Sequence, residues 1–218
     1  MRVCVLGAGT MGHGIAQVTA MAGNDVSLRD VEESLVSEGL DAIASNLDGA
    51  LERDKITPEE KSATLDRIEG TTDLEQSVDE SDLVIEAVPE NLELKQEVLS
   101  EAADLAPKEA IIASNTSSLS VTEIAAEIQH PGRVVGLHFF NPVHIMDLVE
   151  VVEGEQTSDE TLSFAADFVE DIDKTPITIK DTPGFATSRL GVALGVEAMR
   201  MVQEGVASPR DIDRAMEL

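Results

Sequence analysis

A glycine-rich turn near the N-terminus constrains the fold more than any other feature of the chain. The sequence GAGTMG at residues 7–12 follows the apolar run RVCVL and is separated by one residue from the apolar run GIAQV. A strand, this turn and a helix in succession are typical of the first unit of a dinucleotide-binding sheet. In such a unit Gly7 permits the tight turn, Gly9 lets the backbone approach a pyrophosphate, and Gly12 lets the helix pack closely on the strand.

An acidic residue about 20 positions further along supports this interpretation. Asp30 ends a strand predicted at residues 25–30, where a carboxylate accepts hydrogen bonds from an adenosine ribose. The same charge repels a 2′-phosphate, so NAD is the expected cofactor rather than NADP. Arg29 is adjacent and could accept a phosphate, but neighbouring strand residues point to opposite faces. The alternative is a glycine turn that merely connects a strand to a helix.

Predicted helices and strands alternate after Asp30. A helix at residues 32–53 and another that opens at Thr57 form a helical insertion between strands. The later elements are strands at 83–85, 111–113 and 134–137, with helices at 92–105 and 121–128 between them. Ser120 and Glu123 predict a capping box for the second of these helices. The pattern indicates the α/β class, with a Rossmann-type, doubly wound and mostly parallel sheet.

Two further strands, at residues 148–152 and 177–180, flank a predicted helix at 159–172. The motif DTPG that begins at Asp181 is the best boundary, because only helices are predicted beyond it. We therefore expect an NAD-binding, Rossmann-like domain at residues 1–181 and the beginning of an all-helical C-terminal domain at 182–218. Helices at 185–203 and 208–218 carry apolar stripes that two helices alone could hardly bury, which predicts that the chain stops partway through this domain.

The charge balance is strongly acidic. Among 218 residues, 43 are Asp or Glu and 15 are Lys or Arg, which gives a formal net charge of −28 spread along the chain. At molar salt the Debye length falls to about 3 Å, so such a surface stays hydrated without large repulsion. We interpret the charge as halophilic adaptation; the alternative is an ordinary cytoplasmic protein whose charge serves solubility. Nucleic acid and anionic membranes are not expected as partners.

Hydrophobic residues make up 42% of the chain, enough for a substantial core. Cys4 lies inside the first predicted strand and is expected to be buried, and no cysteine–histidine spacing indicates a metal site. Neither a signal peptide nor an apolar run of membrane-spanning length is found. The expected location is the cytoplasm.

Polar residues that follow strands are candidates for ligand contacts, since ligands of parallel sheets lie beyond the carboxyl ends of the strands. After the strand at 83–85, Glu90 and the later Lys95 could reach the nicotinamide half of the cofactor. For Glu90 alone, a turn before a helix that starts at Asn91 is an equally good interpretation. The run SNTSS that begins at Ser114 has more hydroxyls and amides than capping requires, which favours a ligand site.

His138 and Glu150 are the candidate catalytic pair. A histidine beside two phenylalanines is more often a satisfied core residue, but Glu150 lies among apolar residues on the next strand and needs a partner. An imidazole held by a carboxylate becomes a stronger and better oriented base. Pro142 biases Asn141 toward an extended backbone, which would aim its amide. The other histidines, which have no expected role, are His13, His130 and His144.

At these residues the chain resembles the 3-hydroxyacyl-CoA dehydrogenase family. The shared motifs are GAGTMG at 7–12 followed by GIAQ, SNTSSL at 114–119, GLHFFNP at 136–142 and DTPGF at 181–185. The resemblance covers the whole chain and implies oxidation of an (S)-3-hydroxyacyl-CoA to a 3-oxoacyl-CoA with NAD, in fatty-acid or short-chain acyl-CoA metabolism. It also implies an acyl-CoA substrate, a homodimer and a helical domain that continues beyond Leu218.

The resemblance also implies site roles, residue by residue. His138 is the acid–base residue, Glu150 its partner, and Ser117 and Asn141 contact the substrate oxygen and the nicotinamide. Ser188 stands where the family commonly has an asparagine, and we include it among the expected catalytic residues. The expected cofactor contacts are Gly7, Gly9, Thr10, Met11, Gly12, Asp30, Glu90, Lys95, Ser117 and Asn141, and the expected CoA contacts are Asn46 and Arg53.

The implied chemistry is hydride transfer from the hydroxyl-bearing carbon to the nicotinamide, with His138 as general base. Two alternatives remain open. One is an NAD-dependent dehydrogenase of a free hydroxy acid, because fold and cofactor do not specify the substrate. The other is a non-catalytic dinucleotide-binding protein, against which the set of Ser117, His138, Asn141 and Glu150 argues.

Overall fold

The computed structural model describes residues 1–217. The strands are β1 (Arg2–Leu6), β2 (Asp25–Arg29), β3 (Ile68–Thr71), β4 (Leu83–Glu86), β5 (Ile111–Ser114), β6 (Val134–Phe139), β7 (Leu148–Glu153) and β8 (Thr175–Lys180). The helices are α1 (Gly12–Met21), α2 (Glu33–Leu51), α3 (Pro58–Leu65), α4 (Leu74–Val78), α5 (Leu92–Leu105), α6 (Val121–Ala125), α7 (Asp159–Asp171), α8 (Thr187–Gln203) and α9 (Pro209–Glu217), with a 3-10 turn at Pro131–Arg133.

Within the described chain the strands form one sheet in the order β3-β2-β1-β4-β5-β6-β7-β8. Neighbouring strands are parallel except for β6 and β7, which run antiparallel. The first six strands follow the order of a doubly wound dinucleotide-binding sheet, in which the winding reverses between β1 and β4. The predicted Rossmann-type fold is confirmed, and ligands are expected beyond the carboxyl ends of β1 and β4.

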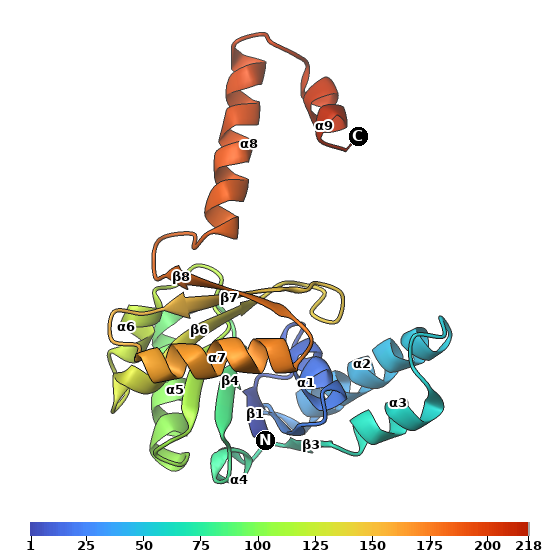
Figure 1. Cartoon of the computed structure of the whole chain (residues 1–218), viewed down its shortest axis with the longest axis vertical. Helices are drawn as coiled ribbons and strands as arrows, with labels where there is room; N and C mark the ends of the chain where they lie inside the picture. The colour runs from blue at the N-terminus through green and yellow to red at the C-terminus, as the bar shows by residue number, and fades with distance from the viewer. Residues whose placement is uncertain (218) are drawn as a thin grey trace.

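Helices cover both faces of the sheet (Figure 1). Along β1 the side chains alternate, so that Val3 and Val5 join the core beneath α1, α2 and α7, while Cys4 and Leu6 join the core beneath α4, α5 and α6. This alternation is the two-residue period of a strand whose two faces are both buried. The glycine turn therefore follows an interior strand of the sheet, flanked by β2 and β4.

The glycine turn is tight for reasons that the structure makes explicit. Gly7 has a φ of +101°, a region that favours glycine, and a Cβ there would lie 2.8 Å from the Ala87 carbonyl oxygen. A Cβ on Gly12 would lie 1.7 Å from the Gly7 carbonyl oxygen. Both glycines are therefore required by the packing of the turn against β4 and by the start of α1.

The helical insertion after β2 consists of α2 and α3. Thr57 caps α3 in a full capping box: its hydroxyl accepts from the Glu60 N–H at 3.2 Å, and the Glu60 carboxylate accepts from the Thr57 N–H at 2.7 Å. At α6 the predicted box is only half formed. The Ser120 hydroxyl accepts from the Glu123 N–H but donates to Asp181, and α6 ends at Ala125 rather than at residue 128.

The sequence did not lead us to expect β3 or α4. β3 is the short run IEGT, whose side chains are exposed or half-buried at the edge of the sheet, so it lacks an apolar period. α4 spans only five residues, too few for a helical period to show. Pairing with β2, rather than its own composition, makes residues 68–71 a strand.

α8 and α9 rise away from the rest of the molecule (Figure 1). No residue of α8 is buried, and Leu190, Val192 and Met199 are 70%, 67% and 73% exposed. The predicted helices at 185–203 and 208–218 are thus present as α8 and α9, although Leu218 lies outside the described residues. None of the helices within residues 1–217 has the length and apolar content needed to cross a membrane.

Candidate active site

A cavity of about 810 Å³ lies beyond the carboxyl ends of β1 and β4, where the winding of the sheet reverses. Five of the predicted cofactor contacts line this cavity: Gly7, Gly9, Thr10, Met11 and Asp30. Gly12 does not line this cavity and instead lies buried behind Gly7. The structure therefore brings the glycine turn and Asp30 together around one space.

The Asp30 carboxylate holds the turn. Its Oδ2 accepts from the Ala8 N–H and its Oδ1 from the Val31 N–H, both at 2.7 Å. Arg29 lines the same cavity, and its Nε donates to the Thr72 carbonyl oxygen at 3.4 Å. Arg29 thus belongs to the cavity wall, while its guanidinium bonds the segment that follows β3.

Gly9 tests whether this space fits a dinucleotide. A Cβ placed on Gly9 would meet no atom within 4 Å, and its φ is not in the left-handed region. The fold itself therefore does not require glycine at this position, unlike at Gly7 and Gly12. Open space above a bare backbone at the start of a helix is what a pyrophosphate needs, so the residues present fit NAD.

A second cavity of about 370 Å³ adjoins the first and shares Met11, Ala87 and Val88 with it. The predicted site residues on its walls are Glu90, Ser117, His138 and Asn141. Glu90, Ser117 and Asn141 follow β4, β5 and β6, and His138 lies near the end of β6, so they meet where the carboxyl ends of parallel neighbours share one edge. The continuity of the two cavities places a reacting group beside a bound dinucleotide.

His138 and Glu150 face each other across the antiparallel pair of β6 and β7. His138 Nδ1 lies 2.6 Å from Glu150 Oε2, and the Glu150 side chain is fully buried. A carboxylate accepts only from a protonated Nδ1, so in the neutral imidazole this contact leaves the lone pair on His138 Nε2 available to a ligand. The predicted pair is present with the geometry of an oriented base.

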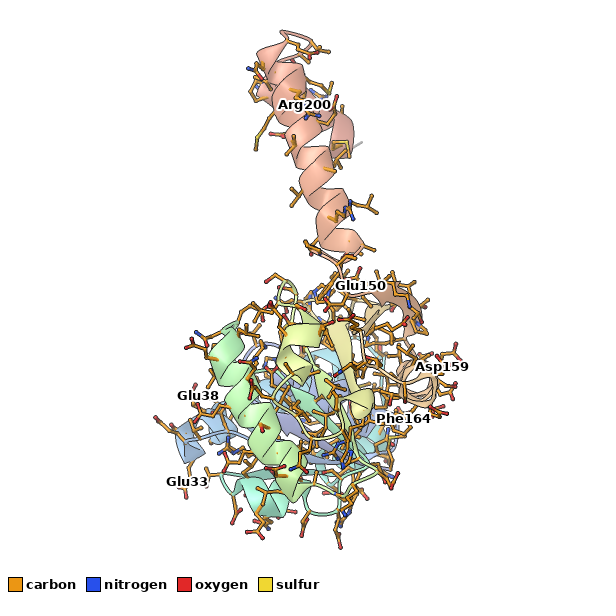
Figure 2. The ribbon with its side chains drawn as sticks, turned by 90° about the vertical axis from the view of Figure 1, so that its left-hand side faces the viewer. Glu33, Glu38, Glu150, Asp159, Phe164 and Arg200 are labelled. Atoms are coloured by element: carbon orange, nitrogen blue, oxygen red, sulfur yellow. The ribbon has the colours of Figure 1, made fainter. Side chains whose placement is uncertain are left out.

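Two aromatic rings and the start of α8 surround this pair. The Phe140 and Phe185 ring centroids lie 4.4 Å and 5.8 Å from that of His138. The second oxygen of Glu150, Oε1, accepts from the N–H groups of Ala186 and Thr187 at 3.1 Å and 2.8 Å. Figure 2 shows Glu150 at the end of the body from which α8 rises. Sequence reasoning missed this contact, although DTPGF marked the segment.

Ser188 follows Thr187 in the first turn of α8 and is half-buried. It lines neither of the two cavities. The structure therefore places Ser188 next to the residues that hold Glu150 but does not bring it together with His138, Ser117 and Asn141 at the cavity wall.

Glu90 organises the loop after β5. Its Oε1 accepts from Thr116 Oγ1 at 2.6 Å and from the N–H groups of Ser117 and Ser118 at 3.0 Å and 3.1 Å. Partial burial alone would raise the pKa of Glu90, but the Thr116 hydrogen bond, the Lys95 charge, the Ser117 N–H and the Ser118 hydroxyl outweigh it and lower the pKa to about 2. Glu90 is therefore a structural anion for the segment that carries Ser117.

Lys95 differs from its predicted role as a direct cofactor contact. Its side chain is 0% exposed and lines neither cavity. Nζ donates to Glu86 Oε1 at 2.6 Å and to the Val88 carbonyl oxygen at 3.2 Å, and lies 3.3 Å from Glu90 Oε2. Burial raises the pKa of Glu86, against the opposing effect of Lys95. The partner role of Glu86 was missed, although a carboxylate next to apolar strand residues is the kind of signal that identified Glu150.

The predicted CoA contacts line a third cavity of about 680 Å³. Asn46 donates to Gln17 Oε1 at 3.1 Å, and Arg53 shares the wall with Lys55 and Lys174. Partial burial, together with His13, Lys174, Arg53 and Lys55, lowers the pKa of His144 at the rim. The cations are balanced by carboxylates in the same wall: Asp147, Asp171 and Asp173.

His13 has a place that the sequence did not indicate. It lines the first cavity, and its Nδ1 lies 2.9 Å from the Gly9 carbonyl oxygen. The signal was available, since His13 directly follows the glycine motif at the start of α1. Within residues 1–217 no three His, Cys, Asp or Glu side chains gather in a way that could hold a metal ion.

Comparison with known proteins gives consistent matches. The family profile described as 3-hydroxyacyl-CoA dehydrogenase, NAD binding domain, matches residues 2–182, and the profile for the C-terminal domain matches residues 184–218. A probable 3-hydroxybutyryl-CoA dehydrogenase of Deinococcus radiodurans is 41% identical over 100% of this chain and 78% of its own length. The mitochondrial hydroxyacyl-coenzyme A dehydrogenase of Rattus norvegicus is 42% identical over 99% of this chain and 70% of its own length.

A solved structure agrees with these relatives. The crystal structure of (S)-3-hydroxybutyryl-CoA dehydrogenase from Ralstonia eutropha superposes with a TM-score of 0.96 at 41% identity. The match covers 100% of this chain and 76% of that one.

Proposed function

The chain belongs to the 3-hydroxyacyl-CoA dehydrogenase family, and from this membership and the site we propose that it oxidises (S)-3-hydroxyacyl-CoA to 3-oxoacyl-CoA with NAD. The observation that carries the proposal is that His138, held by the buried Glu150, lies on the wall of a cavity that adjoins the cavity of the glycine turn. Binding alone does not need an oriented base. The pair therefore favours catalysis over a dinucleotide-binding protein without activity.

NAD, when bound, supplies the acceptor for a hydride. The residues that would hold it are those of the first cavity, with Gly9 beneath the pyrophosphate and Asp30 at the adenosine ribose. The Oδ atoms of Asp30 already accept from two backbone N–H groups, and a carboxylate has further lone pairs for ribose hydroxyls.

His138 removes the proton of the substrate hydroxyl through Nε2, because Nδ1 is bonded to Glu150. The buried Glu150 carboxylate stabilises the imidazolium that forms, and the N–H groups at the start of α8 hold that carboxylate in place. Ser117 and Asn141 lie on the same wall and would position the substrate oxygen. Proton removal and carbon–hydrogen cleavage then take place at adjoining positions.

The third cavity supports a CoA ester over a free hydroxy acid. Asn141 lines the second cavity, which carries His138, and His144 lines the third cavity, which carries Arg53. Only a few residues of one loop separate the two in sequence. A CoA thioester is long enough to use both, whereas a free acid is not. We propose Asn46 and Arg53 as contacts to the CoA nucleotide.

The function is tested by the oxidation of NADH with acetoacetyl-CoA in high salt. The loss of NADH absorbance measures the rate. We expect turnover with acetoacetyl-CoA and none with acetoacetate at equal concentration. Arg53→Ala should raise KM for acetoacetyl-CoA without changing the Kd of NADH. Turnover with acetoacetate alone would favour the free-acid alternative, and NADH binding without turnover would favour the non-catalytic one.

The remaining proposals concern the protein as a whole. The exposed apolar residues of α8 and α9 are consistent with a homodimer and with a helical domain that begins near residue 182, separate from residues 1–181. Light scattering tests the dimer, and limited proteolysis between β8 and α8 tests the boundary. From the sequence we also propose a cytoplasmic location, a role in β-oxidation and a halophilic source. Cell fractionation tests the location.

A further inference from the structure

A buried group of charges lies beneath the second cavity. Glu86 is the last residue of β4, Lys95 lies in the first turns of α5, and Ser114 is the last residue of β5. All three are fully buried. Besides its contact with Lys95, Glu86 accepts from Ser114 Oγ and from the Val88 N–H, each at 2.6 Å. The group joins the ends of two strands to the start of a helix.

This group continues to the cavity wall through Glu90. Lys95 Nζ touches one oxygen of Glu90 at 3.3 Å, and the other oxygen accepts from Thr116, Ser117 and Ser118. A buried ion pair costs desolvation and is weak support for stability by itself. A purely apolar filling would pack these elements as well but would not fix the rotamer of Glu90.

Resting on the proposed function, we propose that Glu86 and Lys95 are positioning residues that set the conformation of the Ser117 loop through Glu90. Both side chains are fully buried and line neither cavity. Lys95 fixes one oxygen of Glu90, and Glu86 with Ser114 fixes Lys95, so the second oxygen of Glu90 meets the loop at a defined point. Ser117 is thereby held on the cavity wall that also carries His138.

The test uses Lys95→Met, which keeps side-chain length but removes the ammonium. Because a small misplacement of a reacting group costs up to about 100-fold in rate, we expect kcat for acetoacetyl-CoA reduction to fall at least about tenfold. The Kd of NADH should change less than about twofold, since Lys95 has no exposed surface. Amide hydrogen exchange at residues 115–118 should become faster.

Arg133→Met is the matched control. Its guanidinium donates to the carbonyl oxygens of Ala103 and Pro107 at the opposite end of α5, at 2.6 Å and 3.0 Å. This variant also loses partly buried hydrogen bonds of a cation and should lower Tm, but it should change neither kcat nor exchange at residues 115–118. If Lys95→Met behaves like Arg133→Met, Lys95 is only structural and the proposal is wrong. A rise of tenfold or more in the Kd of NADH with unchanged kcat would equally overturn it.

Two further variants keep the test decisive if Lys95→Met does not fold. The double variant Glu86→Gln with Lys95→Met removes both buried charges and leaves no unpaired one. Glu90→Gln changes a partly exposed side chain and should release the same loop. In a cycle with Ser117→Ala, the loss from Glu90→Gln should shrink, because both act on one group; additive losses would contradict the proposal.

Hydrogen exchange separates this proposal from the proposed function. If the wild-type chain does not reduce acetoacetyl-CoA, the proposed function fails. Faster exchange at residues 115–118 in Lys95→Met but not in Arg133→Met would still support the positioning role, and equal exchange would overturn it.

Discussion

His138 Nδ1 lies 2.6 Å from Glu150 Oε2, at directly facing positions of β6 and β7. Facing residues of an antiparallel pair project to the same side of a sheet, so register alone delivers the carboxylate to the imidazole. β6 and β7 are the one antiparallel pair of the described sheet, and their register pairs these two residues. The active-site pair is a consequence of sheet topology.

Replacement of either member should show that the two act together. We expect His138→Gln to lower kcat by about 10²- to 10⁴-fold, as for the loss of a general base, while the Kd of NADH stays nearly unchanged. Glu150→Gln should cause a large part of the same loss, and the double variant should be little worse than His138→Gln. Steady-state kinetics with acetoacetyl-CoA and NADH measure this. Full activity of a folded His138→Gln would rule out the assignment, and a variant that only unfolds would favour a core histidine.

The fold was largely predictable because the apolar periods of most strands and helices are intact. β1, β4 and β5 are buried on both faces and read as continuous apolar runs, whereas the edge strand β3 carries no such signal. Register could be inferred only for β6 and β7, where a buried carboxylate and a histidine each needed a partner.

The site was predictable in its residues and less so in their roles. Lys95 falls near a strand end in the sequence, but its burial depends on Glu86, which lies nine positions away on another element. Tertiary contacts of this kind leave no period in the sequence. The contact of Glu150 with the start of α8 was hidden for the same reason, because it joins residues 36 and 37 positions apart.

Gly9→Ala should separate folding from cofactor binding. The added methyl group would meet no protein atom within 4 Å, so Tm should change little. It would occupy the space that the pyrophosphate needs, so the Kd of NADH should rise at least tenfold, as about 1.4 kcal/mol or more of lost contact implies. Calorimetric titration measures the affinity. Gly191→Ala, whose methyl group also meets nothing within 4 Å but lies on α8, is the control and should bind NADH normally. Equal affinity in both variants would contradict the assignment.

Asp30 should determine the choice between NAD and NADP. Its carboxylate is expected to bond ribose hydroxyls and to repel an added phosphate, so we expect NADH to bind more tightly than NADPH. Asp30→Ala should narrow this preference, although it should also loosen the turn by releasing the Ala8 N–H. Because Arg29 lines the same cavity, Arg29→Ala in the Asp30→Ala background should weaken NADPH binding again. Equal affinities of the wild type for both cofactors, by titration calorimetry, would refute the prediction.

Glu90 should contribute a pH-dependent part of the stability. Its pKa falls from an ordinary 4.5 to about 2 in the folded protein. A lowered pKa means that folding favours the ionised form, so the contribution is present above pH 4.5 and is lost as the pH falls toward 2. The free energy of unfolding of Glu90→Gln should therefore approach that of the wild type as the pH is lowered through this window. Urea unfolding at constant salt measures it, and a difference that stays constant from pH 5 to pH 2 would contradict the prediction.

Salt should be required for the native state. With 43 acidic and 15 basic residues, most carboxylates can have no cationic partner, and their repulsion is screened only when the Debye length is short. That length grows from about 3 Å at 1 M to about 30 Å at 0.01 M, so dilution into low salt should unfold or dissociate the protein. We expect KCl and NaCl to restore the helical circular dichroism equally.

Glu97 and Glu101 are exposed, one turn apart on α5, and like charges at this spacing are destabilising. The double variant Glu97→Gln with Glu101→Gln should therefore need less salt. An unchanged spectrum and Tm from low to molar salt would instead show that the charge serves solubility alone.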